Sequence, residues 1–435
     1  MSSGLDETIV PAAGGASRRL RRLQWTILAC LVLSGAVNYM DRAALAVASP
    51  FVQHDLHLSA GKMGILLAVF PWTYAFGQLL VGGLTDRIPP RRVLTASLVL
   101  WSLAQAACGF VRGIFQFGAL RALLAIGESP QFPVGAKAAR TWFAAKERGM
   151  ATGIFNSASS LGSAIAPPVA TLLILTAGWR SMFLLLGIAG LPIALLWWTV
   201  YRHPANAALD PSDREYLSEA LAAPEKTAIS FGNWHHLFRS ATMWGMILGN
   251  AALGYMVSFY ATWLPQYLES GRHISVAQTG WAASIPYVFG VAGSLIGGWC
   301  CDRLERAGFS PADSRKLPIV VSTLGGALFT AFAVGAGSNA LAVSAITVAV
   351  FCCNVASASV WALAVAVAPE EGVASVGSTQ NFGGFVGASV APIVTGFIVQ
   401  ETHSFSAALA IAVAAAASSA LVYATMIRKP IVIED

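Results

Sequence analysis

The sequence predicts an all-α membrane protein of twelve transmembrane helices, arranged as two pseudo-symmetric six-helix bundles. Three observations predict this fold: the composition, the recurrence of long apolar segments, and motifs repeated between the halves. Of the 435 residues, 56% are hydrophobic and only 11% are charged, whereas soluble domains carry about 25% charged residues. Most of the chain therefore belongs in lipid, which does not solvate charge.

Apolar segments long enough to cross a membrane, which requires roughly 20 residues, follow one another along the chain. They lie near residues 25–49, 60–84, 93–111, 114–137, 149–175, 181–201, 240–268, 276–300, 317–336, 340–367, 373–399 and 405–427. The longest polar stretch separates the first six from the last six. The expected domains are a tail at 1–24, a bundle at 25–201, a central loop at 202–239, a bundle at 240–427 and a tail at 428–435.

Basic residues are distributed unevenly between the connecting segments. If the N-terminus is cytoplasmic, 21 of the 27 Lys and Arg residues fall in cytoplasmic segments. This bias predicts a multi-pass protein of the bacterial inner membrane with both termini in the cytoplasm. The net charge of +6 is then explained by basic loops, and nucleic-acid binding is not expected.

The two halves share motifs at corresponding places. Gly82, Asp86 and Arg87, at the end of the second predicted helix, recur as Gly298, Asp302 and Arg303 at the end of the eighth. Asn156, Gly162, Ala166 and Pro167 recur as Asn381, Gly387, Ala391 and Pro392, at a constant offset of 225 residues. Transporters that work by alternating access are commonly built from two similar halves with a substrate site between them.

At these residues the chain resembles the major facilitator superfamily. The signature runs from Gly82 to Arg92 as G-G-L-T-D-R-I-P-P-R-R, with Pro89 where the family usually has glycine. Further motifs resemble the anion:cation symporter branch, which includes permeases for galactonate, hexuronate, glucarate and tartrate. These motifs are N-Y-M-D-R at 38–42, Arg121 with Glu128, W-L-P-x-Y-L at 263–268 and Q-N-F-G-G at 380–384. The resemblance implies a monomer embedded in the lipid bilayer.

Four residues place formal charge well inside the apolar segments: Asp41, Arg42, Arg121 and Glu128. Each costs roughly 2.5 to 3.5 kcal/mol at a helix centre, so they are expected to pair or to line an aqueous cavity. Arg121 and Glu128, seven residues apart, share a helix face about two turns apart and are expected to flank one cavity. A purely structural ion-pair network joining the first and fourth helices is the alternative.

Charge assigns roles to these four residues. An organic anion needs a fixed cation, and the arginine fork matches a carboxylate; Arg42 is the first choice for substrate contact. Arg121 is the second choice, or it acts as a switch partner for the acids. Asp41 and Glu128 are the candidates to gain and lose protons, because burial and a neighbouring arginine act on a carboxyl in opposite directions. Whether one or two protons accompany each anion stays open.

Other candidate residues come from the resemblance. Substrate contacts are expected from Tyr39, Tyr74, Asn250, Trp361 and Asn381, and less specifically from Asn156, Ser157, Ser159 and Ser160. Packing is the alternative for Tyr74 and Trp361, and also for Asn156 and the three serines. Gly82, Asp86, Arg87, Gly298, Asp302 and Arg303 are expected to act in conformational change, or to serve only as a topology signal.

The predicted function is secondary active transport: proton-coupled symport of a small organic anion, such as a hexonate, hexuronate or aldarate. The proton is the coupling ion, and no cofactor or metal is expected. An exchanger or uniporter of organic anions, or a symporter of an aromatic acid or another dicarboxylate, remains an alternative. A phosphate-binding G-x-x-x-x-G-K-[ST] motif is absent from the sequence, and no catalytic triad or zinc motif marks an enzyme.

Overall fold

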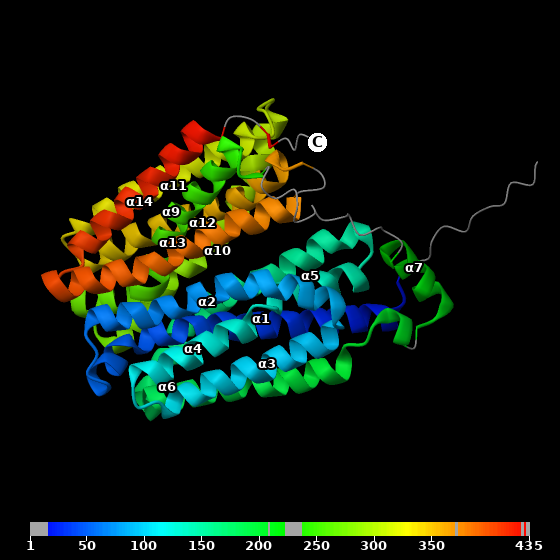
Figure 1. Cartoon of the computed structure of the whole chain (residues 1–435), viewed down its shortest axis with the longest axis horizontal. Helices are drawn as coiled ribbons and strands as arrows, with labels where there is room; N and C mark the ends of the chain where they lie inside the picture. Colours follow the sequence, from blue (N-terminus) through cyan, green and yellow to red (C-terminus); the bar gives the residue numbers. More distant parts are fainter. Residues whose placement is uncertain (1–15, 208, 222–236, 370–372, 428–429, 432–435) are drawn as a thin grey trace, which may run out of the picture.

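The computed structural model of the chain describes residues 16–207, 209–221, 237–369, 373–427 and 430–431. Parts of the predicted tails and central loop (1–15, 208, 222–236, 428–429 and 432–435) lie outside the described residues, as does the side chain of Asp86. Within these ranges the protein is built from helices without strands. Figure 1 shows two layers of long helices, the first half coloured blue to green and the second half coloured green to red.

The first half contains six passes. Its helices are α1 (Arg18–Asp55), α2 (Ala60–Arg87), α3 (Pro90–Ala107), α4 (Ile114–Glu128), α5 (Gln131–Trp142) and α6 (Ala145–Val200), with short 3-10 turns η1 (Cys108–Phe110) and η2 (Pro204–Asn206). Together α4 and α5 make one pass. Helix α6 makes two, because the chain reverses at Gly178, whose φ of 81° lies in the left-handed region that favours glycine.

The second half contains the other six passes. They are α9 (Ala241–Gln266), α10 (Val276–Arg306), α11 (Asp313–Val334), α12 (Asn339–Val367), α13 (Val373–Thr402) and α14 (Ser406–Met426), with a π turn, η4 (Tyr267–Gly271), after α9. The predicted all-α, twelve-pass fold is therefore confirmed for the described chain. Eight of the described helices are long and apolar enough to span a membrane on length and composition alone.

The two ends of the bundle differ in the helix ends that lie there. At one end lie the start of α1, the end of α14 and an additional short helix, α7 (Pro211–Leu221) (Figure 1). We call this the terminal end, and the opposite end, where α1 finishes at Asp55, the distal end. Helix α7 lies in the segment predicted only as a polar loop, and it docks because buried Asp213 accepts hydrogen bonds from the backbone N–H and the hydroxyl of Ser17, at 2.9 and 2.6 Å.

The fourth predicted helix, expected to be continuous from 114 to 137, is interrupted at Ser129 and Pro130. Pro130 has no N–H to donate to the carbonyl of Ile126 four residues earlier, so the helical ladder is broken there. The Ser129 hydroxyl donates to that same carbonyl at 2.8 Å and satisfies it. The break places Glu128 at the last turn of α4, deep inside the bundle.

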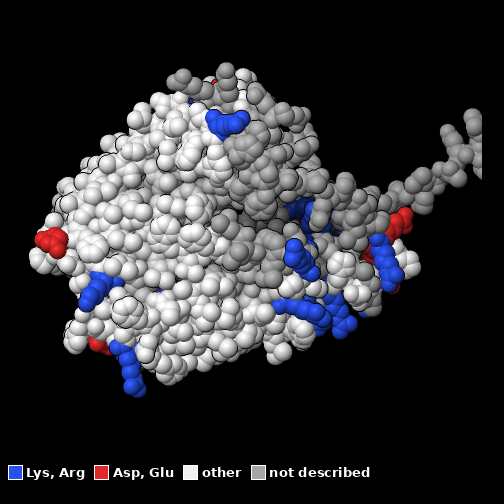
Figure 2. Space-filling model, viewed as in Figure 1, with Lys and Arg blue, Asp and Glu red and all other residues white. Residues whose placement is uncertain are grey.

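The outer surface fits a bilayer. Trp281 and Trp299 lie 18 residues apart on α10 and are 71% and 61% exposed. That separation is about 27 Å along a helix, close to the roughly 30 Å thickness of a bilayer's hydrocarbon core, and interfacial tryptophans are typical of its two borders. Figure 2 shows a broad uncharged band on one face, with Lys and Arg gathered mainly at the terminal end.

Candidate functional site

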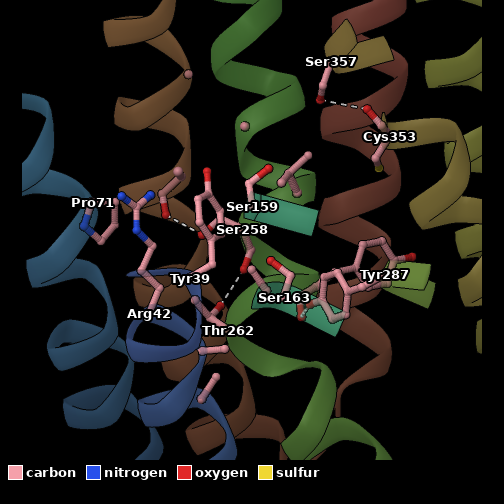
Figure 3. Close-up of a pocket in the computed structure, with 18 of the residues that line it drawn as sticks. Tyr39, Arg42, Pro71, Ser159, Ser163, Ser258, Thr262, Tyr287, Cys353 and Ser357 are labelled. Carbon is pink, nitrogen blue, oxygen red and sulfur yellow. Dashed lines mark hydrogen bonds between the residues drawn. The ribbon is translucent and has the colours of Figure 1, made fainter. Parts of the chain in front are cut away.

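A cavity of about 440 Å³ lies between the two halves. Helices α1, α2, α4 and α6 form one wall, and α9, α10, α12 and α13 form the other. Figure 3 shows Tyr39 and Arg42 on one side of it and Tyr287, Cys353 and Ser357 on the opposite side. The first wall carries two arginines, Arg42 and Arg121.

Arg42 is held between an acid and three aromatic rings. Its Nε donates to Glu128 Oε2 at 2.8 Å. Its guanidinium carbon lies 4.5 Å from the ring centre of Tyr74, 4.7 Å from that of Tyr39 and 5.0 Å from that of Phe70. These cation–π contacts replace part of the lost hydration of the cation. Arg42 Nη2 is buried without an aligned hydrogen-bond partner among the described residues, while the side chain as a whole lines the cavity.

Glu128 is fully buried and does not line the cavity. The sequence predicted that Arg121 and Glu128 would flank the same cavity two turns apart. Instead, Arg121 lines the cavity while Glu128 lies behind Arg42, because the Arg42 side chain reaches across from α1 to the end of α4. The ion pair joins the first and fourth helices, as the structural alternative expected, and its arginine also faces the cavity.

Arg121 is the second cation of the cavity. Its Nη1 donates to the backbone carbonyl of Asp41 at 3.1 Å, and its guanidinium carbon lies 5.2 Å from the Phe70 ring centre. Asp41 follows the rule that neighbouring helical residues point about 100° apart. Arg42 faces the cavity, and the Asp41 side chain is fully buried behind it.

The wall from the second half carries neutral polar groups among the described residues. Of the predicted substrate contacts, Asn250, Trp361 and Asn381 all lie there. Asn250 Nδ2 donates to the carbonyl of Gln380 at 2.9 Å, which ties α9 to α13. The same wall also presents Ser258, Thr262, Tyr287, Asn354 and Ser357, which the sequence analysis did not single out.

Several predicted contacts lie elsewhere in this conformation. Ser159 and Ser160 line the cavity, but Asn156 and Ser157 are exposed outside its lining. The Ser157 hydroxyl donates to the Ile154 carbonyl of its own helix at 2.6 Å. Tyr74 packs behind Arg42, where its hydroxyl accepts a hydrogen bond from Gln78 at 2.8 Å.

The residues predicted to act in conformational change lie at the terminal end. Arg87, Asp302 and Arg303 have exposed side chains there, and a Cβ at Gly298 would meet no atom within 4 Å. The backbones of Gly82 and Asp86 belong to the last turns of α2. Lys137 Nζ donates to the Thr85 carbonyl at 2.6 Å, so α5 is fastened to the end of α2.

At the distal end the halves are closed against each other. Gln266 Oε1 on α9 accepts hydrogen bonds from Ser49 Oγ at 3.0 Å and Gln53 Nε2 at 2.9 Å, both on α1. Gln400 Oε1 on α13 accepts from the backbone N–H of Gly61 at 3.2 Å. These three hydrogen bonds between the halves all lie at the distal end, whereas Trp361, on the terminal side of the cavity, is 54% exposed.

Three buried residues near the acids were not identified from the sequence. Phe70 packs against both arginines, and Asn38 and Gln105 are fully buried amides. Asn38 lies inside the N-Y-M-D-R motif, one helical turn before Asp41, and this spacing was the available signal. Gln105 stood out only as an amide in an apolar segment, where packing residues look the same.

Comparisons with known proteins agree with this architecture. The chain matches the Major Facilitator Superfamily over residues 31–388 and 272–432. A "Probable L-galactonate transporter" of Escherichia coli (strain K12) is 40% identical over 415 residues, 95% of this chain and 92% of that protein. The "Hexuronate transporter" of Bacillus subtilis (strain 168) is 30% identical over 388 residues, 89% of this chain and 90% of that protein.

Solved structures share the fold at low identity. A bacterial homolog of the lysosomal transporter Spinster, in an inward-facing and occupied conformation, has a TM-score of 0.74 at 17% identity, covering 95% of this chain and 96% of that one. A D-xylose-proton symporter has a TM-score of 0.72 at 16% identity, covering 93% and 98%. The chain is a multi-pass membrane transport protein that belongs to the Major Facilitator Superfamily.

Proposed function

We propose that the protein is a proton-coupled symporter that imports a sugar acid across the bacterial inner membrane by alternating access. The names of its relatives support the substrate class: transporters of galactonate, of galactarate or D-glucarate, and of hexuronate are 30 to 40% identical to it. A symporter needs a site where the anion and the proton influence each other. The ion pair at the edge of the cavity provides one.

The observation that carries the proposal is the position of Arg42, which faces the cavity and binds Glu128 at 2.8 Å. The two arginines and two acids of the cluster sum to zero charge when both acids are ionised. A bound carboxylate then adds a negative charge that nothing compensates inside a low-dielectric bundle. A proton on Glu128 or Asp41 restores neutrality, so anion and proton favour each other's binding.

The transport step follows from competition between the substrate carboxylate and Glu128 for Arg42. An incoming carboxylate accepts hydrogen bonds from the guanidinium of Arg42, whose planar fork matches it. The ion pair between Glu128 and Arg42 is then weakened, and Glu128 takes up a proton, which leaves it neutral behind the arginine. The anion and the proton leave together when the halves rock and open the cavity on the other side.

The cavity favours a polyhydroxylated monocarboxylate. Its cations lie on the wall of the first half, and among the described residues the opposite wall offers amides and hydroxyls without Lys or Arg. A hexonate or hexuronate would place its carboxylate at Arg42 and its hydroxyls at Asn250 and Asn381. A second carboxylate would meet neutral donors there, so an aldarate should bind less well.

The basic terminal end supports a cytoplasmic placement of the described ends of α1 and α14. In that orientation the closed distal end faces the periplasm, and the conformation described here is open to the cytoplasm. The two halves then exchange contacts at opposite ends during the cycle, with the cavity remaining between them.

Uptake into proteoliposomes tests the proposal. Galactonate, glucuronate and galactarate are offered with and without an imposed inward proton gradient. Accumulation of a monocarboxylate above its external concentration, only with the gradient, is the expected result. If the gradient has no effect while preloaded vesicles exchange the same anion, the protein is an exchanger. If no organic acid is transported, the sugar-acid assignment is wrong.

A further inference from the structure

A second hollow, of about 600 Å³, lies at the distal end of the protein, and we call it the distal hollow. The second half forms most of it, and its lining shares no residue with that of the central cavity. The two spaces are neighbours, because Pro265 lines the cavity and Gln266, the next residue along the chain, lines the distal hollow. The distal hollow therefore lies just beyond the hydrogen bonds that close the distal end.

The lining of the distal hollow combines positive charge with neutral polar groups. It includes one arginine, two histidines and two glutamines: Arg272, His273, His403, Gln266 and Gln400. The nearest acids along the chain, Glu269 and Glu401, do not line it, and none of its described lining residues is Asp or Glu. Such a lining offers hydrogen-bond donors and a fixed cation to an anion, and it offers no carboxylate to a cation.

Arg272 is anchored in the wall of the distal hollow. Its Nε donates to Asn339 Oδ1 at 3.1 Å, and Asn339 Nδ2 donates to the Arg272 carbonyl at 3.3 Å. The guanidinium has five N–H groups, and the bond to Asn339 uses one of them. Because the side chain already has an anchor, a carboxylate can bind the remaining fork at a smaller cost in side-chain entropy.

Helix α14 begins at the distal hollow. Ser406 and Leu409, in its first turn, both line the distal hollow, so the positive end of the helix dipole borders it. Ser404 Oγ accepts the N–H of Ser406 at 3.2 Å, and the N-cap residue, Phe405, makes no side-chain capping bond. The N–H groups that a first turn leaves without an intrahelical partner are suited to binding anions.

The two histidines of the lining have a strained backbone. The φ angles of His273 and His403 are 54° and 51°, in the left-handed region that favours glycine. His273 lies between η4 and α10, and His403 lies between α13 and α14. Strained residues persist where the surrounding structure holds them, and they are concentrated at functional sites. In this protein, two strained loops meet at one hollow.

We propose that the distal hollow is an outer binding site for the carboxylate of the transported anion, an assignment that rests on the proposed import of a sugar acid. In the orientation proposed above, this end faces the periplasm, from which the anion arrives. Gln266 and Gln400 both line the distal hollow, and they also accept the three hydrogen bonds from the first half. The bound anion therefore waits directly against the closure that must open to admit it to Arg42.

Protection of introduced cysteines from a thiol reagent tests the outer site. Ser404→Cys reports on the distal hollow, where Ser404 is half-buried. Val257→Cys reports on the central cavity, where Val257 is 40% exposed. Each reporter is introduced into full-length protein whose native cysteines are replaced. The purified variants are treated with a maleimide at increasing concentrations of galactonate, and the uncharged polyol galactitol is the control ligand.

Galactonate is expected to slow the modification of Ser404→Cys, whereas galactitol should leave it unchanged. The protection should persist with Arg42→Lys, which removes the guanidinium fork from the central cavity. With Arg272→Gln, the galactonate concentration for half-maximal protection should rise about tenfold, because a charge-assisted hydrogen bond is lost. Arg112→Gln is the matched control, since Arg112 is exposed between η1 and α4 and does not line the distal hollow.

Three results would overturn the outer site alone. The first is protection of Val257→Cys without protection of Ser404→Cys, which leaves the proposed function standing. The second is protection of Ser404→Cys that disappears with Arg42→Lys, or that weakens equally with Arg272→Gln and Arg112→Gln. The third is protection by phosphatidylglycerol and not by galactonate, which would assign the distal hollow to a lipid headgroup.

The two reporters also separate this inference from the proposed function. If galactonate protects neither cysteine, the sugar-acid assignment and the outer site are both wrong. If it protects Ser404→Cys and not Val257→Cys, the outer site is supported, and the central cavity is not where the sugar acid binds.

Discussion

Arg42 Nε lies 2.8 Å from Glu128 Oε2, and only the arginine of this pair faces the cavity. Breaking a buried ion pair by removing one partner is costly, because the remaining charge is left uncompensated. A ligand carboxylate that competes for Arg42 imposes the same penalty on Glu128, unless Glu128 takes up a proton. The pair therefore links events in the cavity to a residue that the ligand does not touch.

Arg42→Lys should reduce uptake at least tenfold although it keeps the charge. A lysine is a point donor that cannot bind Glu128 and a substrate carboxylate with a planar fork. Initial uptake rates of the accumulated sugar acid measure this effect. Arg91→Lys is the control, because Arg91 donates to the Trp198 carbonyl at the terminal end. Wild-type uptake in Arg42→Lys would refute the substrate contact assigned to Arg42.

Glu128→Gln should abolish gradient-driven accumulation and preserve exchange. The amide is neutral at every pH, so it imitates the protonated acid and leaves Arg42 free to bind the anion. Counterflow of labelled substrate, measured next to net uptake under a proton gradient, separates the two activities. Loss of both activities together with a normal thermal unfolding midpoint would show that Glu128 is needed for anion binding itself.

Gln266→Ala should favour the state that is open at the distal end. Gln266 Oε1 accepts two hydrogen bonds from α1, each contributing about 0.5–1.5 kcal/mol. A cysteine placed at Val47 in the cavity, with the native cysteines replaced, should react about tenfold faster with an impermeant thiol reagent added from the distal side. Gln116→Ala is the control, since Gln116 Oε1 accepts a hydrogen bond from the Arg112 N–H within the first half.

Asp213→Ala should destabilise the fold without affecting transport by the folded protein. Asp213 is buried and accepts two hydrogen bonds from Ser17, so its loss should lower the free energy of unfolding by about 1–3 kcal/mol. The thermal unfolding midpoint of the variant in detergent, expected to be lower than that of the wild type, measures this loss of stability. Exposed Asp210 provides the control, Asp210→Ala. Equal midpoints for the two variants would mean that α7 is not docked in solution.

The sequence alone was sufficient to predict the fold and the two arginines on one wall of the cavity. Charge inside apolar segments is costly enough to identify Arg42 and Arg121, and the periodicity of α1 correctly separates Asp41 from Arg42. The pairing of Glu128 was not predictable in the same way. It depends on the break at Ser129 and Pro130 and on the length of the Arg42 side chain, which spacing along one helix does not report.

The limits of helical periodicity are clear on α6. Asn156, Ser160 and Ser163 recur at helical spacing on one face, yet only the two serines line the cavity. A helix face is known from the sequence, but the part of its length that meets the cavity depends on where the other half packs.

The distal closure is made of amides, hydroxyls and a backbone N–H, without an ion pair among the hydrogen bonds that join the halves there. Neutral hydrogen bonds do not titrate and are hardly weakened by dissolved ions, whereas exposed ion pairs are screened by them. The distal closure should thus hold equally well at acidic pH, at alkaline pH and at high salt concentration. The two fully buried acids, Asp41 and Glu128, are shielded from the ionic strength of the medium as well.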